Sequence, residues 1–549
     1  MKKSTLLGLA FLVPTTLSNP TPGYGEQSFA ERCTSLANDL TVSAGFAVHV
    51  NIAQHLPAGT IIDNAAEGVN ETCADVAAPA LPASICRLAL RIATSDVSET
   101  LVETWLPEEW NGRFLATGNS GMAGCVAYPE LAYGTSYGFA TIGTDNGHNG
   151  TSGEVFYLHP GVLEDYVWRA IYAGTVVGKD LTRQFYGAES CKDMKAYFVG
   201  CSTGGRQGFK AAQNNPELFD GVVAGAPVIY LMSLQAWYGT SRKLLTSNTS
   251  EHAFVGPDHW ALVQTEVLKQ CDGLDGAHDG IVEDVRACQP DLTRLLCTTT
   301  SSPRASCLTA PQLSTITTLF SPLTTANGTL IHAGPSHSFE PSLTTVLTSP
   351  LVFTYLNDWF RGVVYSDRSW SAATFSPADA EAVLTHDRFD AQSSSPDLSA
   401  FRARGGKLLH WHGQADSVLP ISMSDRHYAR VGAALNASVA ELDDFYRYFR
   451  ISGMDHCFGG PGASFLGQTA GMVAGDDAED NLLTRIVAWV EGGEAGAPET
   501  VRGTKFVDDS VEAGVKFTRR HCKFPRVNVY RGEEVDGRDE EGWACVEDQ

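Results

Sequence analysis

Residues 196–212 read AYFVGCSTGGRQGFKAA, and this stretch decides the fold. The apolar run at 196–199 predicts a buried strand, and the residues from Gly205 onward predict a helix. Between them Ser202 stands in a G-x-S-x-G sequence, in which Gly200 and Gly204 permit a turn too sharp for larger side chains. A strand, a tight turn with serine at its apex and a helix predict an exposed serine nucleophile, Ser202, at the end of a parallel strand.

Strands and helices alternate on either side of this stretch. Apolar runs predict strands at residues 113–117, 139–143 and 221–227, and apolar residues at helical spacing predict a helix over 162–186. The alternation is typical of a doubly wound, mainly parallel sheet, and with the serine turn it predicts an α/β-hydrolase fold. Further elements are expected as strands at 46–50, 88–92, 407–412 and 445–451 and as a last amphipathic helix at 480–491.

The pattern changes between residues 228 and 403, where helical segments mix with Ser/Thr-rich loops and aromatic patches. We interpret this stretch as a large lid inserted into the sheet domain. The predicted organisation is therefore a catalytic domain in two parts, 19–227 and 404–549, interrupted by a lid at 228–403.

Residues 1–18 have the features of a signal peptide. Lys2 and Lys3 give a positively charged start, residues 6–13 give a short apolar core, and small polar residues follow near Ser18. The alternative is a buried first strand. The apolar core is too short to span a bilayer, and no later stretch is long and apolar enough to do so. We therefore expect a secreted, extracellular protein that does not bind a membrane.

Charge, sequons and cysteines limit the partners and agree with secretion. A formal net charge of −24, without a long Lys/Arg cluster, argues against nucleic acid as a partner. Most of the 13 cysteines should pair in a secreted chain, and the odd number leaves at least one unpaired. Proximity in sequence suggests the pairs Cys271–Cys288, Cys297–Cys307 and Cys522–Cys545. N-x-[ST] sequons, which also arise by chance, give candidate glycosylation sites at Asn70, Asn149, Asn248, Asn327 and Asn436.

The partners of a nucleophilic serine are expected after the lid, in the order acid and then histidine. Asp416 follows the strand at 407–412, and His456 follows the strand at 445–451, so both lie on loops at carboxyl ends of strands. Asp455 is too close to His456 to orient its ring, and we interpret it as a surface acid. The weaker candidates lie within predicted strands or a helix: His410, His412, Asp425 and His427.

Two cysteines flank the candidate catalytic residues. Cys201 precedes Ser202, and Cys457 follows His456. A working triad brings serine and histidine within hydrogen-bond reach, so their neighbours can form a disulfide that closes 256 residues. The chain-entropy model gives such a bridge about 5 kcal/mol, and it would also fix the base against the nucleophile. The alternative is two unrelated cysteines.

The paired Cys-Ser and His-Cys dipeptides, with an aspartate between them in the chain, resemble the tannase and feruloyl esterase family. Residues 200–208, 219–221, 453–457 and 144–148 also look like that family, as does the tail from Arg520 to Cys545. The resemblance covers nearly the whole mature chain. It implies an α/β-hydrolase core, a lid and hydrolysis of esters of aromatic acids. It also implies the disulfides Cys33–Cys86 and Cys73–Cys125, which leave Cys191 unpaired.

A glycine-rich loop, GNSGMAG at residues 118–124, follows the strand at 113–117. Such a loop lets backbone N–H groups approach a ligand, although it can also be an ordinary flexible turn. In a hydrolase it supplies the second oxyanion donor, beside the N–H of Thr203. Relatives often have two adjacent glycines after the asparagine, whereas this chain has Ser120 and Gly121, so the second donor is either of these two residues.

The lid contains an acidic loop, CDGLDGAHDGI, at residues 271–281. Carboxylates at this density suit Ca²⁺, although the spacing differs from an EF-hand and composition alone favours a solvated turn. The family resemblance implies one structural calcium ion in such a loop. It implies as ligands the side chains of Asp272, Asp275 and Asp279 and the carbonyls of Ala277 and Ile281.

These features together predict a secreted serine carboxylesterase without an organic cofactor. The expected substrates are hydroxycinnamate esters, such as feruloyl groups on plant cell-wall polysaccharides. The first alternative is a gallate ester, which would make the enzyme a tannase. A more remote alternative is a non-catalytic hydrolase-fold protein that binds sugars or a protein partner, although such proteins usually lose one triad residue.

Overall fold

The computed structural model describes residues 27–42, 45–247, 250, 252–298, 306–338, 340–533 and 536–548. The predicted signal peptide and the sequon asparagine Asn248 lie outside these described residues. Within them, no helix has the length and apolar character needed to cross a membrane.

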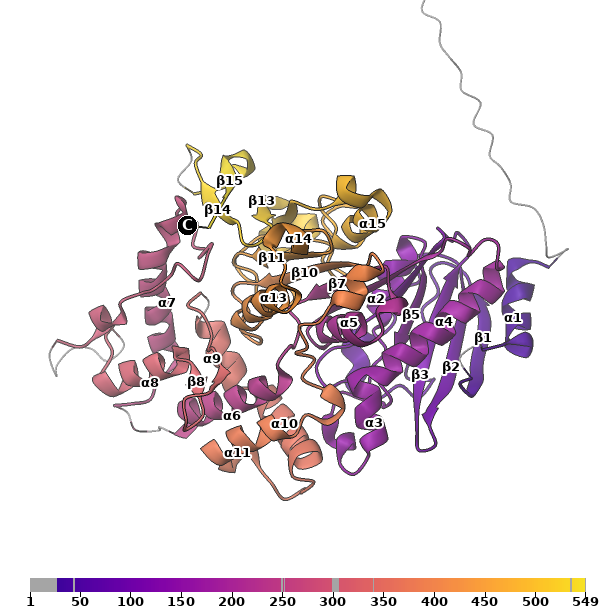
Figure 1. Cartoon of the computed structure of the whole chain (residues 1–549). Helices are drawn as coiled ribbons and strands as arrows, with labels where there is room; N and C mark the ends of the chain where they lie inside the picture. Colours follow the sequence, from indigo (N-terminus) through magenta and orange to yellow (C-terminus); the bar gives the residue numbers. More distant parts are fainter. Residues whose placement is uncertain are drawn as a thin grey trace, which may run out of the picture.

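A twisted central sheet organises the chain (Figure 1). Six neighbouring strands from β5 to β11 run parallel, and β1, β2 and β3 extend the sheet in antiparallel fashion. The apolar runs form strands because helices cover both faces of the sheet, as parallel sheets require. In the described residues the order is β1 (Val48–Leu56), β2 (Ile85–Ser95), β3 (Ser98–Pro107), β5 (Ala140–Thr144), β4 (Arg113–Thr117), β6 (Lys195–Cys201), β7 (Gly221–Gly225), β10 (Lys407–Gly413) and β11 (Tyr446–Ile451).

Alternate side chains of the central strands β4, β6, β7, β10 and β11 enter two different cores. On one face, Phe114 and Phe198 pack in the core that includes α4 (Ala170–Tyr186) and α5 (Thr203–Asn214). On the other face, Leu115 and Tyr197 pack with α2 (Tyr128–Ser136) and α15 (Leu482–Gly492). Two helix layers around one sheet confirm the predicted doubly wound arrangement.

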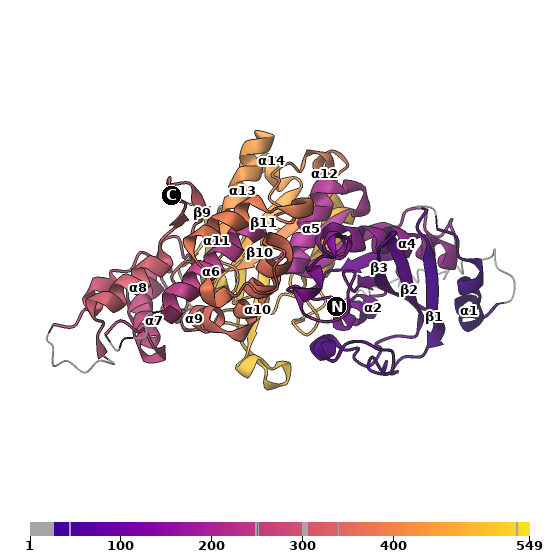
Figure 2. The same cartoon turned by 90° about the horizontal axis from the view of Figure 1, so that it is seen from below.

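The segment between β7 and β10 is mostly helical and gathers on the side of the molecule away from β1 (Figures 1 and 2). The domain boundaries at residues 228 and 403 remain predictions. The helices of this segment are α6 (Leu231–Ser247), α7 (Pro257–Cys271), α8 (Ala310–Phe320), α9 (Glu340–Thr348), α10 (Pro350–Trp359), α11 (Pro377–Ala382) and α12 (Ser399–Ala403), with the short hairpin β8 (Leu323–Thr324) and β9 (Leu330–His332).

Several elements differ from the sequence-based expectation. The helix expected over 162–186 is interrupted by a π-helical turn, Asp165–Arg169, between α3 (Pro160–Glu164) and α4. Strand β3 was not predicted, because buried Glu103 and Thr104 break its apolar pattern and Glu103 pairs with buried Arg87. After α15 two further hairpins form, β12 (Thr500–Phe506) with β13 (Val515–Cys522) and β14 (Val527–Tyr530) with β15 (Trp543–Val546).

Six disulfides crosslink the described chain, and buried Cys191 is the free cysteine. The pairs are those expected from the sequence and from the family resemblance: Cys33–Cys86, Cys73–Cys125, Cys201–Cys457, Cys271–Cys288, Cys297–Cys307 and Cys522–Cys545.

Candidate active site

Ser202 occupies a strained apex between β6 and α5. Its φ of 62° and ψ of −120° are unfavourable for a residue with a side chain. Backbone hydrogen bonds hold it there, since its N–H donates to Gly225 at 2.9 Å and its carbonyl accepts from Arg206 at 3.0 Å. A Cβ at Gly200 would lie 2.7 Å from the backbone of Gly204, so the turn requires glycine. The serine side chain is thereby presented at the carboxyl edge of the sheet.

Asp416 and His456 meet on the loops that follow β10 and β11. Nδ1 of His456 lies 2.8 Å from Oδ2 of Asp416. Oδ1 accepts from the N–H groups of Val418 at 2.9 Å and Leu419 at 2.6 Å. Burial opposes ionisation of Asp416, but the imidazole of His456 and the hydrogen bonds outweigh it and hold the pKa of Asp416 below its usual range. Conversely, Asp416 raises the pKa of His456 against the effect of burial.

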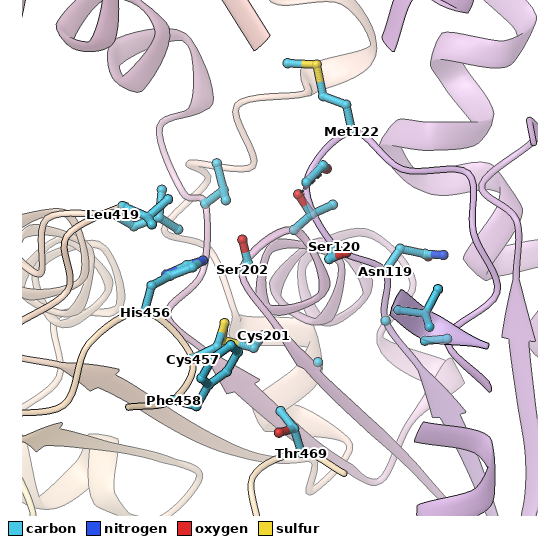
Figure 3. A pocket seen from close by; sticks show the side chains of 18 of the residues that line it. Asn119, Ser120, Met122, Cys201, Ser202, Leu419, His456, Cys457, Phe458 and Thr469 are labelled. Atoms are coloured by element: carbon cyan, nitrogen blue, oxygen red, sulfur yellow. Dashed lines mark hydrogen bonds between the residues drawn. A yellow bond between two sulfur atoms is a disulfide. The ribbon is translucent and has the colours of Figure 1, made fainter. Parts of the chain in front are cut away.

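Ser202 and His456 line the same cavity, which has a volume of about 690 Å³. Figure 3 shows the two side chains beside each other above the Cys201–Cys457 disulfide. The Cα atoms of these cysteines are 6.0 Å apart. The bridge therefore joins the residue before the serine directly to the residue after the histidine, and it couples two loops that are remote in the chain.

The glycine-rich loop is fixed beside Ser202 by polar contacts. Thr203 is the first residue of α5, so its N–H has no acceptor within the helix. Its hydroxyl donates to the carbonyl of Gly121 at 2.6 Å, and the hydroxyl of Tyr166 donates to the same carbonyl at 3.0 Å. Gly121 has a φ of +53°, and a Cβ there would lie 2.1 Å from the hydroxyl of Tyr355, which explains glycine at this position.

Asn119 is a further positioning residue that the sequence analysis did not identify. Its amide nitrogen donates to the carbonyls of Cys125 at 3.0 Å and Thr144 at 2.7 Å. Its backbone N–H donates to the side chain of Gln207 on α5 at 2.9 Å. The loop is thus tied to the helix that begins at the serine. The glycine-rich sequence gave no indication of the contacts with Thr144 and Gln207, because these residues are far from Asn119 in the chain.

The cavity has walls of different chemistry. The segment between β7 and β10 lines the cavity with Gln235, Ser342 and a larger set of apolar and aromatic side chains, which we call the apolar wall: Leu231, Leu234, Tyr238, Val346, Leu351 and Tyr355. Polar groups stand elsewhere along it, including Asp75, Glu130, Gln468 and Thr469. Figure 3 places Thr469 on the opposite side of Ser202 from Met122 and Leu419. Burial raises the pKa of Glu130 to about 7, although the N–H of Ala470 donates to its carboxylate.

The interpretation of Asp455 as a surface acid is wrong. Its carboxylate is half-buried and accepts from the N–H and the hydroxyl of Ser417 at 2.9 and 2.7 Å. It also accepts from the N–H of His456 at 2.7 Å and from the hydroxyl of Ser342 on α9 at 2.9 Å. Asp455 therefore joins both catalytic loops to α9. The position of Asp455 next to His456 in the sequence argued against Asp455 orienting the imidazole ring. It did not reveal that the backbone turns the Asp455 carboxylate toward Ser417 and Ser342.

The four weaker candidates do not line the cavity. His410 and His412 are buried on β10, and Asp425 and His427 lie on α13 (Ser422–Leu435). His412 nevertheless reaches the site indirectly, because its Nε2 lies 3.1 Å from Oδ2 of Asp416. The sequence analysis placed this residue in a strand and missed the contact.

The acidic loop follows α7. Oδ1 of Asp272 accepts from the N–H groups of Asp279, Gly280 and Ile281 at 2.9 to 3.2 Å. Asp275 accepts from the N–H of Ala277 at 2.7 Å. In the described residues, no three His, Cys, Asp or Glu side chains are already gathered as a metal-binding group. The donor chemistry still fits a hard cation, because burial with Glu283 and Asp279 nearby raises the pKa of Asp275 to about 7.

Four of the five sequon asparagines are exposed: Asn70, Asn149, Asn327 and Asn436. Two of these are neighbours in space, since the N–H of Asn70 donates to the side chain of Asn149 at 2.9 Å. The amide nitrogen of Asn149 donates to the carbonyl of Gly68 at 2.9 Å, so a glycan there would emerge beside this contact.

Comparison with known proteins places this geometry in a family. The family model for tannase and feruloyl esterase matches residues 86–541. A probable feruloyl esterase B from Aspergillus clavatus is 41% identical over 521 residues, covering 95% of this chain and 96% of that protein. A probable feruloyl esterase B-2 from Aspergillus fumigatus is 40% identical over 548 residues, covering 100% of both.

Solved structures agree. The crystal structure of feruloyl esterase B from Aspergillus oryzae matches with a TM-score of 0.87 and 40% identity, over 94% of this chain and 100% of that chain. Tannin acyl hydrolase from Aspergillus niger matches with a TM-score of 0.74 at 20% identity, over 94% of this chain and 95% of that chain, which shows a common fold. These matches confirm the α/β-hydrolase fold.

Proposed function

Because the chain belongs to the tannase and feruloyl esterase family and is a carboxylic ester hydrolase, we propose that it releases hydroxycinnamates from plant cell-wall polysaccharides through Ser202, His456 and Asp416. The observation that carries the assignment of residues is the Asp416–His456 contact of 2.8 Å beside a strained serine in one cavity. A serine, an imidazole and a buried carboxylate in this order are the parts of a catalytic triad.

In the proposed reaction His456 accepts the proton of Ser202 as the serine oxygen attacks the ester carbonyl. Asp416 keeps the Nδ1–H of His456 pointing toward itself and stabilises the imidazolium. The oxyanion accepts hydrogen bonds from the N–H of Thr203 and from that of Ser120 or Gly121. His456 then protonates the leaving alcohol. Water, deprotonated by the same histidine, hydrolyses the acyl-enzyme and releases the acid.

The cavity lining supports an ester with one aromatic and one polar partner. A cavity of about 690 Å³ is large enough for an ester that joins an aromatic acyl group to a sugar alcohol. We place the aromatic acyl group against the apolar wall that includes Tyr238 and Tyr355. The sugar alcohol would then face the polar groups, among them Glu130 and Thr469. Tyr355 lies on α10, and Asp358 anchors this helix because its carboxylate accepts a hydrogen bond from the hydroxyl of Ser152 at 2.9 Å.

A gallate ester is the second candidate, because the family includes tannases. Relatives at about 40% identity named feruloyl esterase B favour the hydroxycinnamate. The deciding experiment compares kcat/KM for methyl ferulate, caffeate, p-coumarate, sinapate and gallate. A hydroxycinnamate as best substrate supports the proposal, and a preference for methyl gallate would replace it by a tannase. Labelling by an organophosphonate separates both from a non-catalytic binding protein, which would not react.

We further propose that the chain is secreted and binds one structural calcium ion. Residues 1–18 have signal-peptide features, and the exposed sequon asparagines are accessible to glycosylation. Asp272, Asp275 and Asp279 with the carbonyls of Ala277 and Ile281 would hold the ion, whose charge would offset that of the carboxylates. Amino-terminal sequencing of protein recovered from culture medium tests the cleavage after Ser18.

A further inference from the structure

A buried line of polar side chains leads from Asp416 into the protein interior. It consists of His412 and His410 on β10, Ser424 on α13 and Tyr446 at the start of β11. These four residues have 0% of their surface exposed, and none of them lines the cavity of Ser202. Burying four polar side chains together is unfavourable unless each finds a partner, so their arrangement requires a reason.

The four side chains form a continuous series of hydrogen bonds. The hydroxyl of Tyr446 lies 2.8 Å from Nδ1 of His410, and Nε2 of His410 lies 2.9 Å from Oγ of Ser424. The same oxygen lies 2.7 Å from Nδ1 of His412. Finally, Nε2 of His412 lies 3.1 Å from Oδ2 of Asp416 and 2.9 Å from the carbonyl oxygen of Leu419.

The carbonyl of Leu419 sets the direction of the whole series. A carbonyl and a carboxylate can only accept, so Nε2 of His412 must carry the hydrogen that faces them. An imidazole that carries its one N–H at Nε2 accepts at Nδ1, here from the hydroxyl of Ser424. That hydroxyl in turn accepts from Nε2–H of His410, whose Nδ1 accepts from Tyr446. Each donor therefore points toward Asp416.

With this donor, Asp416 has no acceptor position left free. Oδ1 receives the N–H groups of Val418 and Leu419, and Oδ2 receives Nδ1–H of His456 and Nε2–H of His412. A carboxylate offers about four such positions, so the four donors specify a single orientation of the group. His412 does not line the cavity, and it contacts the same carboxylate oxygen as His456, which does.

We infer that His412 is a positioning residue: held in one tautomer by the carbonyl of Leu419 and supported at its other nitrogen by Ser424, His410 and Tyr446, it fixes the carboxylate that orients the catalytic histidine. The inference rests on the proposed function, since it assigns a role within the same triad. Its consequence is specific: loss of the donor lets Asp416 rotate and misplaces His456 without changing any group that contacts substrate. The turnover number should fall while KM stays constant.

The test compares His412→Leu with His412→Gln on the best methyl ester. Leucine fills a similar volume but donates nothing, and kcat should fall about 10- to 100-fold, since small misplacements of catalytic groups have effects of this size. Glutamine places an amide donor near the position of Nε2 and should recover most of the lost kcat. Ser424→Ala and Tyr446→Phe act at greater distance and should reduce kcat by roughly 2- to 10-fold.

His427→Leu is the matched control. His427 is also fully buried on α13, stacks edge-on against Phe209 as His410 does, and has no hydrogen-bond partner for either nitrogen in the described structure. Its replacement should leave kcat unchanged, whatever it does to the melting temperature. If the loss of any buried histidine lowered kcat by disturbing the core, kcat would fall in His427→Leu as well.

Wild-type kcat in His412→Leu would overturn the inference, and so would an equal loss in His412→Leu and His412→Gln with KM raised in both. If His412→Leu does not fold, the Ser424→Ala and Tyr446→Phe variants replace it in the test. A wild-type kcat in both of them would overturn the inference. Ser202→Ala distinguishes failure of this inference from failure of the proposed function. An active Ser202→Ala enzyme would contradict the triad itself. An inactive Ser202→Ala enzyme together with a fully active His412→Leu enzyme would contradict only the role of His412.

Discussion

The loop of Asp416 and the acidic loop at residues 271–281 bury carboxylates with opposite results. Asp416 is surrounded by four donors, and its pKa lies below the usual range despite burial. Asp275 accepts one hydrogen bond in the described structure, from Ala277, and its pKa is raised to about 7. Burial is common to both, so the donors and the charges around each carboxylate decide the direction of its pKa shift: His456 and His412 stand beside Asp416, whereas Glu283 and Asp279 stand beside Asp275.

The comparison separates two uses of aspartate in this protein. At the active site the protein supplies every donor, and the anion is ready to orient an imidazole. In the acidic loop the protein supplies fewer donors than the carboxylates need, and Arg519 shares its single charge between Asp279 and Glu283. The remaining deficit of positive charge is what a bound cation would supply.

The largest expected effect is that of Asp416→Asn. An asparagine amide that faces His456 would donate instead of accept, which forces the imidazole into the wrong tautomer. We expect kcat to fall about 10⁴-fold, as for the corresponding change in a serine protease triad. Steady-state kinetics with active-site titration measures this. A loss below tenfold would show that Asp416 does not orient His456.

Opening the Cys201–Cys457 bridge should have the next largest effect. In the double variant Cys201→Ser with Cys457→Ser, we expect kcat to fall up to about 100-fold, because the loops of nucleophile and base are no longer joined. The free energy of unfolding should also fall, by about 5 kcal/mol in the chain-entropy model.

The matched control is Cys522→Ser with Cys545→Ser, which opens a bridge that lines no part of the cavity. This control should lose stability but retain kcat. Equal kcat losses in both double variants would mean that the catalytic bridge contributes only stability.

Removal of calcium should have the smallest effect, and on stability alone. Excess chelator should lower the melting temperature by several degrees, since an ion present at 100 times its Kd contributes about 2.7 kcal/mol. Asp275→Asn should abolish the response to chelator. Asp291→Asn, at an exposed position of the same segment between β7 and β10, should retain it. An unchanged melting curve, with no metal found by elemental analysis, would count against the site.

Local patterns predicted much of the fold and the three residues that we propose as a triad, two of which, Asp416 and His456, are in contact. Strands β4 and β6 contain continuous apolar runs, and Asp416 and His456 follow the ends of β10 and β11 in the order that the fold requires. Strand β3 was missed because its buried Glu103 is compensated by Arg87, a partner on another strand. Local sequence cannot show such compensation, because it depends on strand pairing.

The supporting residues of the site were missed for the same reason. Asp455 looked like a surface acid and His412 like an ordinary strand residue, yet both bind groups on neighbouring loops. Asn119 ties the glycine-rich loop to β5 and α5. Their roles arise from distances across the carboxyl edge of the sheet, and a motif read along one chain segment does not contain those distances.

The central claim is that Ser202 is the nucleophile of an ester hydrolase with a covalent acyl-enzyme. The most direct measurement is the rate of methyl ferulate hydrolysis by the wild-type enzyme and by Ser202→Ala at equal protein concentration. The account predicts ready hydrolysis by the wild type and a loss of at least about 10⁴-fold in the variant. Hydrolysis by Ser202→Ala at a rate comparable to that of the wild type would contradict it.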